Sequence, residues 1–485
     1  MAVAGSTTPR PKKPVSMKLP SSTLPSIILL FLGAVLLFSV SPHLPYLTPP
    51  SFPSSAGKPW SGDLRFADFS WNSLRFPSNP PPTTLKVAVF SRKWPSSSSP
   101  GGMERHALTL HSALSRRGHR VHVFTSALDS PPSASTAGFP SLHPLTGGWR
   151  CDEAFALFEA EHARAPFDIV HSESVALYHR FALRVPNLAV SWHGISLEAL
   201  YSGIFQDLIR RSDEPLSPSF NRSLAAAIYK VIDEIRFFGS YAHHVAISDS
   251  AGEILRDVYQ IPSGRVHVIL NGVDEDDFRP DPELGTAFRA QLGVPADADL
   301  VMGVAGRLVK DKGHPLLFEA FAEITKRHPK LYLVVAGSGP WEQRYKELGE
   351  KVIVAGSLPP EKLRAFYNSI DVFVNPTLRP QGLDLTMMEA MLCGTPVMAT
   401  RFSSIKGSVV VGEELGLMFA PNAAAVQEAM EVAVREGKVR MAERGRACRK
   451  HAAAMFTARK MAMAYERLFL CIKNESFCRY PLEFD

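Results

Sequence analysis

Residues 331–337 have the sequence LYLVVAG, and residues 351–356 have the sequence KVIVAG. Both runs are almost wholly apolar and end in glycine, and the residues between them are more polar. Short apolar runs separated by amphipathic stretches are typical of parallel strands joined by helices. The pattern therefore predicts an α/β unit. It recurs on both sides, in LVMGVAG (300–306), DVFVNP (371–376) and TPVMAT (395–400).

The same alternation occupies the first half of the chain, where we expect a second α/β unit. A helix is predicted at 101–117 and a long one at about 220–240, while the Pro-, Ser- and Gly-rich insert 127–150 predicts a loop. Residues 271–298 interrupt the pattern with Asn271-Gly272, three prolines and an acidic run. We therefore predict two doubly wound Rossmann-like domains that face a cleft. The expected strands of the first are 85–91, 121–126, 167–172, 188–193, 243–248 and 266–270.

Length and charge narrow the class of protein. A chain of 485 residues with 45% hydrophobic and 21% charged residues is globular and long enough for two domains. Four of the basic residues that make up the net charge of +6 lie in residues 1–25, which contain no acid. The remainder carries +6 − 4 = +2. The basic character thus belongs to a tail, and we expect no nucleic-acid partner.

The N-terminal region predicts a membrane anchor. Residues 26–40, SIILLFLGAVLLFSV, form an apolar core that nearby residues extend toward a bilayer-spanning length. The preceding basic segment would stay in the cytosol. A cleaved signal peptide is the competing interpretation. Ten prolines in residues 42–82 indicate an extended stem. Sequons at Asn221 and Asn474 fit a lumenal location for the rest of the chain, and Cys471 and Cys478 could pair there, although their spacing alone does not decide it.

One constellation in the second half has the chemistry of a nucleotide site. Arg307 and Lys312 lie at a strand end and in the loop after it, in GRLVKDKG (306–313). Glu389 follows the start of a helix expected near Leu385 and Thr386. Two cations and free helix N–H groups can bind a pyrophosphate, and a carboxylate can accept both hydroxyls of a ribose. On these residues alone, a surface ion pair beside a core-packed helix remains equally open.

The second half resembles the C-terminal half of glycosyltransferase family 4, the sugar-nucleotide-dependent transferases with the two-Rossmann GT-B fold. The resemblance extends more thinly into the first half and covers most of residues 85–455. It is carried by GRLVKDKG, VVAGSGP (334–340), VIVAGSLP (352–359), IDVFVNPT (370–377) and EAMLCGTPV (389–397), and by GGMERH (101–106), RRGHRVHVFT (116–125), SWHG (191–194), AISD (246–249) and LNGVD (270–274).

The resemblance implies a role for each matching residue. Arg307 and Lys312 match the pair that neutralises the donor diphosphate, so that no divalent metal or other cofactor is expected. Glu389 matches the second glutamate of the E-x7-E element, which binds the ribose. The other matches are His193, near the donor sugar and assisting catalysis; Leu385 and Thr386, whose backbone N–H groups contact phosphate; and Gly101 and Gly102, in the loop that faces the donor phosphates and the acceptor.

Two positions depart from the family pattern. Gln381 stands where the first glutamate of E-x7-E is expected, and Asp384 replaces a glycine, so that E-G-F-G becomes QGLD (381–384). An amide at 381 can still hydrogen-bond to the donor sugar, but it cannot stabilise positive charge at the anomeric carbon. Altered donor choice and a catalytically silent, lumenal binding or scaffold protein are the two explanations.

We therefore expect a retaining glycosyltransferase, anchored as a single-pass type II protein in the Golgi membrane or, alternatively, that of the endoplasmic reticulum. Its partners would be a nucleoside diphosphate sugar, with a UDP-sugar as the family-level expectation, and a glycan, lipid or small-molecule acceptor hydroxyl. The expected segments are a cytosolic tail (1–25), the anchor (26–46), the stem (47–84), an acceptor domain (85–278), a linker (279–298), a nucleotide-sugar domain (299–455), and a C-terminal helix that crosses back, with a tail (456–485).

Overall fold

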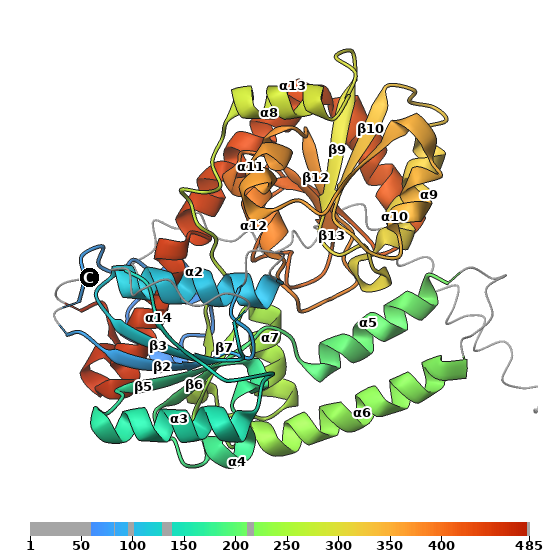
Figure 1. The fold of residues 1–485 in the computed structure, drawn as a ribbon. Coiled ribbons are helices and arrows are strands. Elements are labelled where there is room, and N and C mark those ends of the chain that lie inside the picture. The colour runs from blue at the N-terminus through green and yellow to red at the C-terminus, as the bar shows by residue number, and fades with distance from the viewer. Residues whose placement is uncertain (1–59, 82, 96–100, 129–137, 211–217, 483–485) are drawn as a thin grey trace, which may run out of the picture. The chain divides into compact units, whose positions relative to one another are not determined.

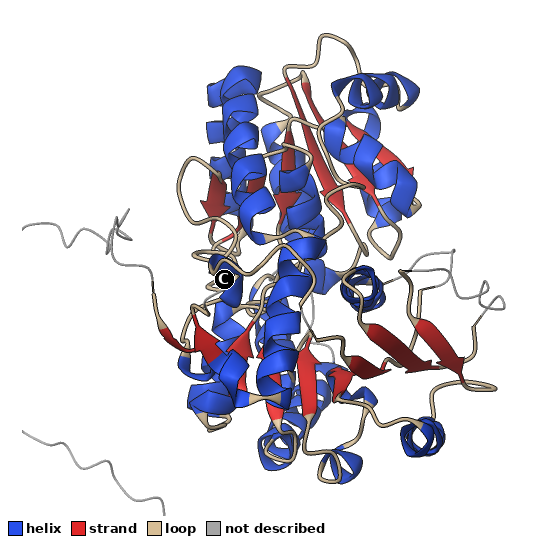
Figure 2. Cartoon of the chain, turned by 90° about the vertical axis from the view of Figure 1, so that its left-hand side faces the viewer, coloured by secondary structure: helices blue, strands red, loops and turns tan. Residues whose placement is uncertain are grey.

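The computed structural model describes residues 60–81, 83–95, 101–128, 138–210 and 218–482. The unit from Ser61 to Asp485 contains one parallel β-sheet in each half of the chain (Figure 1). Figure 2 shows helices on both sides of each set of strands. The predicted α/β architecture with two parallel sheets is confirmed.

The first sheet has seven strands in the order β4-β3-β2-β5-β6-β7-β8, all pairs parallel. Its central strands are buried along their whole length, which explains their continuous apolar sequences. Helix α2 and the C-terminal helix α14 (Ala458–Lys473) lie over one face, and α3 and α4 lie over the other (Figure 1). The strands are β2 (Lys86–Phe90), β3 (Arg120–Thr125), β4 (Ser141–Pro144), β5 (Ile169–Glu173), β6 (Leu188–Trp192), β7 (His243–Ala246) and β8 (Val266–Val268), and the helices of this half are α2 (Gly102–Arg116), α3 (Cys151–Arg164), α4 (His179–Ala182), α5 (Ser196–Leu208), α6 (Pro218–Phe238) and α7 (Asp249–Glu253).

The second sheet has six strands in the order β11-β10-β9-β12-β13-β14, again all parallel. The strands are β9 (Leu300–Ala305), β10 (Leu331–Ala336), β11 (Val352–Gly356), β12 (Val372–Asn375), β13 (Val397–Thr400) and β14 (Gly416–Phe419). The helices are α8 (Pro282–Gln291), α9 (His314–Ile324), α10 (Glu342–Lys346), α11 (Pro360–Asn368), α12 (Leu385–Leu392) and α13 (Ala423–Met455), which has a kink at Gly437.

The last helix, α14 (Ala458–Lys473), packs on α2 and β5 of the first half. This is where the sequence places the C-terminal helix that crosses back. The crossing runs beside the first connection between the halves, because the N–H of Val273 donates to the carbonyl of Phe456 at 2.9 Å and the N–H of Ala458 donates to the carbonyl of Val273 at 2.8 Å. The two segments that connect the halves of the chain, at Val273 and at 456–458, are thus hydrogen-bonded to each other.

Residues 61–81 differ from the expected stem. They form the strand β1 (Gly62–Asp63) and two short 3₁₀ turns, and the side chains of Leu64 and Trp71 are fully buried. Asn72 Nδ2 donates to the carbonyl of Met455 at 2.8 Å, so this segment packs where the last helices meet the first half. A high proline content indicates extended chain, but it does not indicate whether apolar residues spaced between the prolines are buried. The earlier part of the stem lies outside the described residues.

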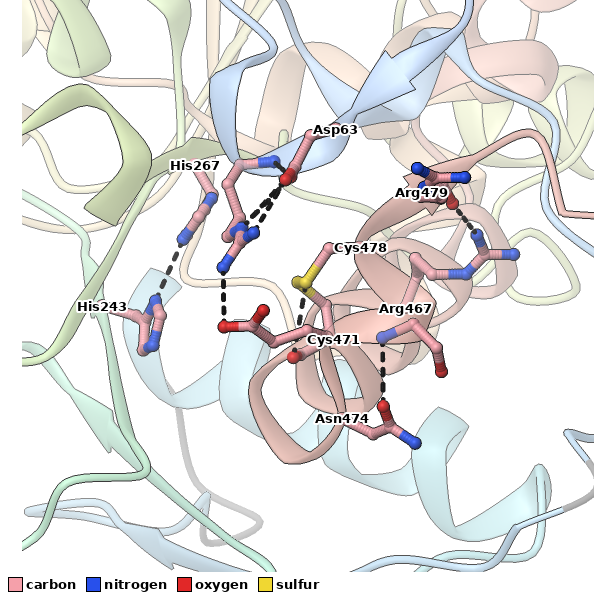
Figure 3. Close-up of a disulfide and its surroundings, with 11 residues drawn as sticks. Asp63, His243, His267, Arg467, Cys471, Asn474, Cys478 and Arg479 are labelled. Carbon is pink, nitrogen blue, oxygen red and sulfur yellow. Dashed lines mark hydrogen bonds and ion pairs between the residues drawn. A yellow bond between two sulfur atoms is a disulfide. The ribbon is translucent and has the colours of Figure 1, made fainter.

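The strand β1 pairs with β15 (Arg479–Tyr480) next to a disulfide between Cys471 and Cys478 (Figure 3). The pairing that the sequence left open is therefore present. The insert 127–150 also differs from the expected loop, because it contains the edge strand β4 at Ser141–Pro144. Among the described residues, no helix is both long and apolar enough to cross a membrane. The predicted anchor, 26–46, lies outside the described residues.

Candidate active site

A pocket of about 430 Å³ lies at the carboxyl ends of the central strands of both sheets. Ligands of open parallel sheets bind at this edge, because the loops after the strands converge there. The pocket brings together, from both halves of the chain, most of the site residues expected from the sequence, namely Gly101, Gly102, His193, Arg307, Lys312, Leu385 and Thr386.

Helix α2 points its N-terminus into this pocket. Gly101 precedes its first turn, and residues 101–105 line the pocket. No side chain of the described residues caps the helix, and Gly101 at the N-cap has none to offer, so within the described part of the chain the N–H groups of the first turn face the pocket without a side-chain partner. Free helix N–H groups and the helix dipole favour an anion. Gly101 and Gly102 therefore lie at the pocket, and their contact with a donor or an acceptor stays a prediction.

Arg307 and Lys312 reach the pocket from the loop after β9. The Arg307 side chain is 68% exposed and lies 3.9 Å from Asp311. Lys312 is only 19% exposed and forms an ion pair with Asp384. The backbone of Gly313, with φ +75°, follows directly, and a Cβ there would lie 1.7 Å from the carbonyl oxygen of Pro376. This close approach to the end of β12 fixes the loop that carries both cations.

Asp384 contributes directly to the charge of the pocket. Besides Lys312, its carboxylate accepts a hydrogen bond of 3.1 Å from Asn375 Nδ2. Burial would raise the pKa of Asp384, but Lys312, Arg379 and the Asn375 hydrogen bond outweigh it, and the pKa is lowered. The residue that replaces the family's glycine thus stays ionised and already neutralises one of the two cations expected to bind diphosphate.

Helix α12 begins directly after Asp384, and the residues of its first turn, Leu385 and Thr386, line the pocket. Asp384 does not cap this helix, because its side chain makes no hydrogen bond to the first turn. The first turn of α12 therefore lies at the pocket, and contact of its N–H groups with a donor phosphate stays a prediction.

Glu389 lies one turn further along α12 and is fully buried, and it is not among the pocket-lining residues. Arg105 of α2 forms an ion pair with one of its oxygens, and the hydroxyl of Tyr367 donates to the other at 2.6 Å. Both oxygens expected to bind a ribose are thus engaged within the protein. The ion pair joins a helix of the first half to a helix of the second.

Gln381 is also buried and does not line the pocket. Its backbone carbonyl accepts a hydrogen bond of 2.9 Å from Ser248 Oγ, while its side-chain oxygen has no partner among the described residues. Next to it, Arg379 lines the pocket and forms an ion pair of 3.1 Å with the buried Glu198 of α5. The carboxylate of Glu198, from the first half of the chain, therefore lies close to Gln381, where the family pattern has a glutamate.

His193 lines the pocket just after β6. Its Nε2 lies 2.5 Å from Oε2 of Glu173, the last residue of β5. The sequence reasoning missed Glu173, because its relation to His193 depends on β5 and β6 being neighbours. The available signal was that polar residues stand at the ends of two predicted strands: Glu173 directly follows FDIVHS (167–172), and His193 ends LAVSWH (188–193).

Two groups of side chains have the composition of a metal site, with ligand atoms within 4.8 Å of one another: His106, Glu173 and His193, and His111, His171 and Glu173. Hydrogen bonds at 2.5 Å and 2.9 Å already join Glu173 to His193 and His111. Of these side chains, His193 lines the pocket together with Arg307 and Lys312, whereas the other four are buried and do not line it.

Both halves of the chain match family models. Residues 100–277 match the model described as glycosyltransferase family 4, and residues 299–436 match the model described as glycosyl transferases group 1. A D-inositol 3-phosphate glycosyltransferase of Kineococcus radiotolerans is 27% identical over 377 residues, which cover 69% of this chain and 82% of that protein.

Solved structures share the fold. A sucrose-phosphate synthase from Thermosynechococcus elongatus superposes with a TM-score of 0.63 at 21% identity, covering 80% of this chain and 98% of that one. The HepE protein of Anabaena, solved in complex with UDP and glucose, superposes with a TM-score of 0.54 at 18% identity, covering 80% of this chain and 99% of that one.

Proposed function

We propose that this chain, which is a GT-B glycosyltransferase, transfers a sugar from a nucleoside diphosphate sugar to an acceptor hydroxyl with retention of anomeric configuration. The observation that carries the proposal is the convergence of Arg307, Lys312 and the N-termini of α2 and α12, whose N-cap residues make no side-chain hydrogen bond to the helix, on one pocket between the two sheets. Two cations and two helix ends aimed at one space suit a diphosphate better than a neutral ligand. A uridine nucleotide is the donor we propose, since HepE of similar fold binds UDP.

The chemistry follows from where charge develops. When the glycosidic bond breaks, negative charge accumulates on the departing diphosphate, and Arg307 and Lys312 stabilise it more strongly in the transition state than in the ground state. The leaving phosphate oxygen takes the proton of the acceptor hydroxyl on the same face of the sugar, so that no pair of carboxylates of the glycosidase kind is required. The acceptor, which can be a glycan, a lipid or a small molecule, enters from the first half.

Donor choice is the part of the function where this chain departs from its relatives. Asp384 places a carboxylate beside the expected diphosphate, and Gln381 offers an amide where a glutamate is usual. The buried Glu198, paired with Arg379, adds a carboxylate from the first half. We propose that these three residues change which sugar is accepted rather than abolish transfer.

The test is incubation of the full chain with a panel of sugar nucleotides, with and without simple acceptors. Transfer or slow hydrolysis with any donor supports the enzyme, and Arg307→Ala serves as the matched control with reduced activity. Nucleotide binding without turnover across the panel would favour a silent binding protein. Because no divalent metal is expected at the diphosphate, activity should survive excess EDTA, and complete loss that manganese restores would contradict that part of the proposal.

We also propose a type II location in the Golgi membrane, with the endoplasmic reticulum as the alternative. The support is the basic segment 1–25 and the apolar run that follows it. In sealed microsomes, added protease should spare the catalytic unit until detergent is present. Digestion of that unit without detergent would overturn this topology. The proposed transfer activity does not depend on the topology and would still stand.

A further inference from the structure

A buried polar network lies directly behind His193. Glu173 Oε2 lies 2.5 Å from His193 Nε2, and Glu173 Oε1 lies 2.9 Å from His111 Nε2. Glu173 is almost completely buried, whereas His193 reaches the pocket. An ionised carboxylate has no proton to donate and can only accept hydrogen bonds. Each of the two histidines must therefore present an N–H to Glu173. His193 then keeps Nδ1 as a hydrogen-bond acceptor.

The backbone is arranged to make this contact. Glu173 pairs with Ser191 across the parallel strands β5 and β6, so that His193 follows two residues further along. The next residue, Ser174, has φ +51°, a conformation that non-glycine residues rarely adopt. Its hydroxyl accepts a hydrogen bond of 3.4 Å from the backbone N–H of His193. A strained serine thus ties the end of β5 to the histidine at the pocket, and such strain gathers at functional sites.

The charge of Glu173 is not cancelled by its buried neighbours. Burial would raise its pKa, but the hydrogen bonds that its carboxylate accepts from His111 and His193 oppose burial, and the pKa is held well below its ordinary value. Burial lowers the pKa of His171 to about 3 and that of His106 well below its ordinary value, so both are neutral. A lone buried carboxylate therefore stands behind the one histidine of this group that faces the pocket.

We propose that Glu173 is a positioning residue that holds His193 in a single tautomer and ring orientation beside the donor sugar. This inference rests on the proposed transfer reaction, because His193 acts on the sugar only if a sugar donor occupies the pocket. A histidine fixed by a buried carboxylate keeps one defined nitrogen for the substrate and tolerates positive charge on its ring when the neighbouring bond breaks. The network continues from His171 Nε2 to Ser191 Oγ at 2.8 Å and on to the Tyr465 hydroxyl at 2.7 Å, which anchors it to α14.

The first experiment is a double-mutant cycle in the full chain with Glu173→Gln and His193→Ala. If Glu173 acts through His193, Glu173→Gln should lower kcat at least tenfold and change the donor KM less than threefold. It should have almost no further effect on kcat in the His193→Ala background. Effects on kcat that multiply in the double variant would overturn the proposal, because a purely structural role has no reason to require His193.

A matched control separates loss of positioning from loss of stability. Glu466 is likewise a buried carboxylate bound to a histidine, with His119 Nε2 at 2.8 Å, but it does not line the pocket. Glu466→Gln should lower the melting temperature as Glu173→Gln does while leaving kcat within twofold of the wild type. An equal loss of kcat in both variants would contradict a specific role for Glu173.

A measurement without turnover keeps the inference distinct from the proposed function. In protein labelled with ¹⁵N-histidine, the carboxylate-bound Nε2–H of His193 should give a downfield proton signal that both His193→Ala and Glu173→Gln remove. If no donor is turned over but this signal is present, the proposed transfer reaction is wrong, whereas the contact between Glu173 and His193 is confirmed. Absence of the signal, or one equivalent of tightly bound metal in purified protein that is lost in Glu173→Gln, would overturn the positioning role in favour of no contact or of a metal site.

Discussion

The ion pair between Lys312 and Asp384 lies where a donor diphosphate is expected, so we expect these two residues to influence how strongly a nucleotide binds. Lys312 can contact phosphate only by sharing its charge with Asp384 or leaving it. Arg307, by contrast, is largely exposed, and its neighbour Asp311 lies 3.9 Å away. Removing Lys312 should therefore change the stability of the ligand-free protein more than removing Arg307 does.

Arg307→Ala should lower kcat/KM by between about ten- and a thousandfold, because charge-assisted hydrogen bonds to phosphate are worth roughly 1.5–3 kcal/mol each. Its melting temperature should stay near that of the wild type, since an exposed pair contributes little to stability. Steady-state kinetics and thermal unfolding measure both. Lys312→Ala should lose a similar factor in kcat/KM and also melt earlier, because Asp384 would be left without its cation. Wild-type kinetics in both variants would contradict the assignment of Arg307 and Lys312 as the diphosphate-binding residues.

Asp384→Asn should strengthen nucleotide binding. The substitution removes a negative charge beside the diphosphate and frees Lys312, while an amide keeps the shape of the side chain and its contact with Asn375. An interaction of about 1.4 kcal/mol corresponds to tenfold, so we expect the Kd for UDP to fall by roughly that factor. Calorimetric titration with UDP measures this Kd. The control is Asp311→Asn, which removes the carboxylate beside the exposed Arg307 instead. Weaker binding in Asp384→Asn would mean that the carboxylate contacts the donor itself.

At the scale of helices and strands, the sequence predicted what depends on local pattern. The apolar runs 85–91, 121–126 and 331–337 became β2, β3 and β10 because continuous burial in a parallel sheet leaves that pattern in the sequence. Lys312, Leu385 and Thr386 were found because strand ends and helix starts are local features. Strand β4 and residues 61–81 were missed, because edge pairing and packing against distant helices leave no local pattern.

Contacts between distant elements explain the rest of what was missed at the site. Glu173 becomes a partner of His193 only when β5 and β6 are neighbours, and the ion pair of Arg105 with Glu389 requires both sheets to be placed. Glu389 could be predicted as a ribose ligand from its place in α12, but its burial and its partners could not. Long-range electrostatic pairing has no periodicity to detect.

Gly313 sets the position of the loop between β9 and α9. Gly313→Ala should cost about 3 kcal/mol or more of stability and lower kcat/KM, because both the left-handed backbone and the collision with the Pro376 carbonyl oppose a methyl group. Gly349→Ala is the matched control, since its φ of +70° is likewise left-handed but nothing lies within 4 Å of its added Cβ. Thermal unfolding and kinetics of both variants measure the difference. Equal, small costs would show that the loop is free to move.

At the scale of the whole catalytic unit, the two halves are held together across the pocket by polar contacts rather than by apolar surface alone. Arg105 binds Glu389, Arg379 binds Glu198, and Ser248 donates to the carbonyl of Gln381. Each contact uses a residue at or next to the expected donor site. If the proposed donor competes for these groups, its binding and the strength of the contacts between the halves are energetically linked.

Arg105→Met tests that linkage. In the empty protein the substitution leaves Glu389 buried with only the Tyr367 hydroxyl, so that breaking the pair should cost about 3 kcal/mol and lower the melting temperature. In the presence of UDP, ribose hydroxyls can replace the lost partner, and the rise in melting temperature at saturating UDP should exceed that of the wild type. Arg440→Met, which breaks an exposed ion pair of 2.8 Å with Glu443, should change neither value. A smaller UDP-induced rise in Arg105→Met would mean that Arg105 itself binds the nucleotide and that Glu389 stays within the protein.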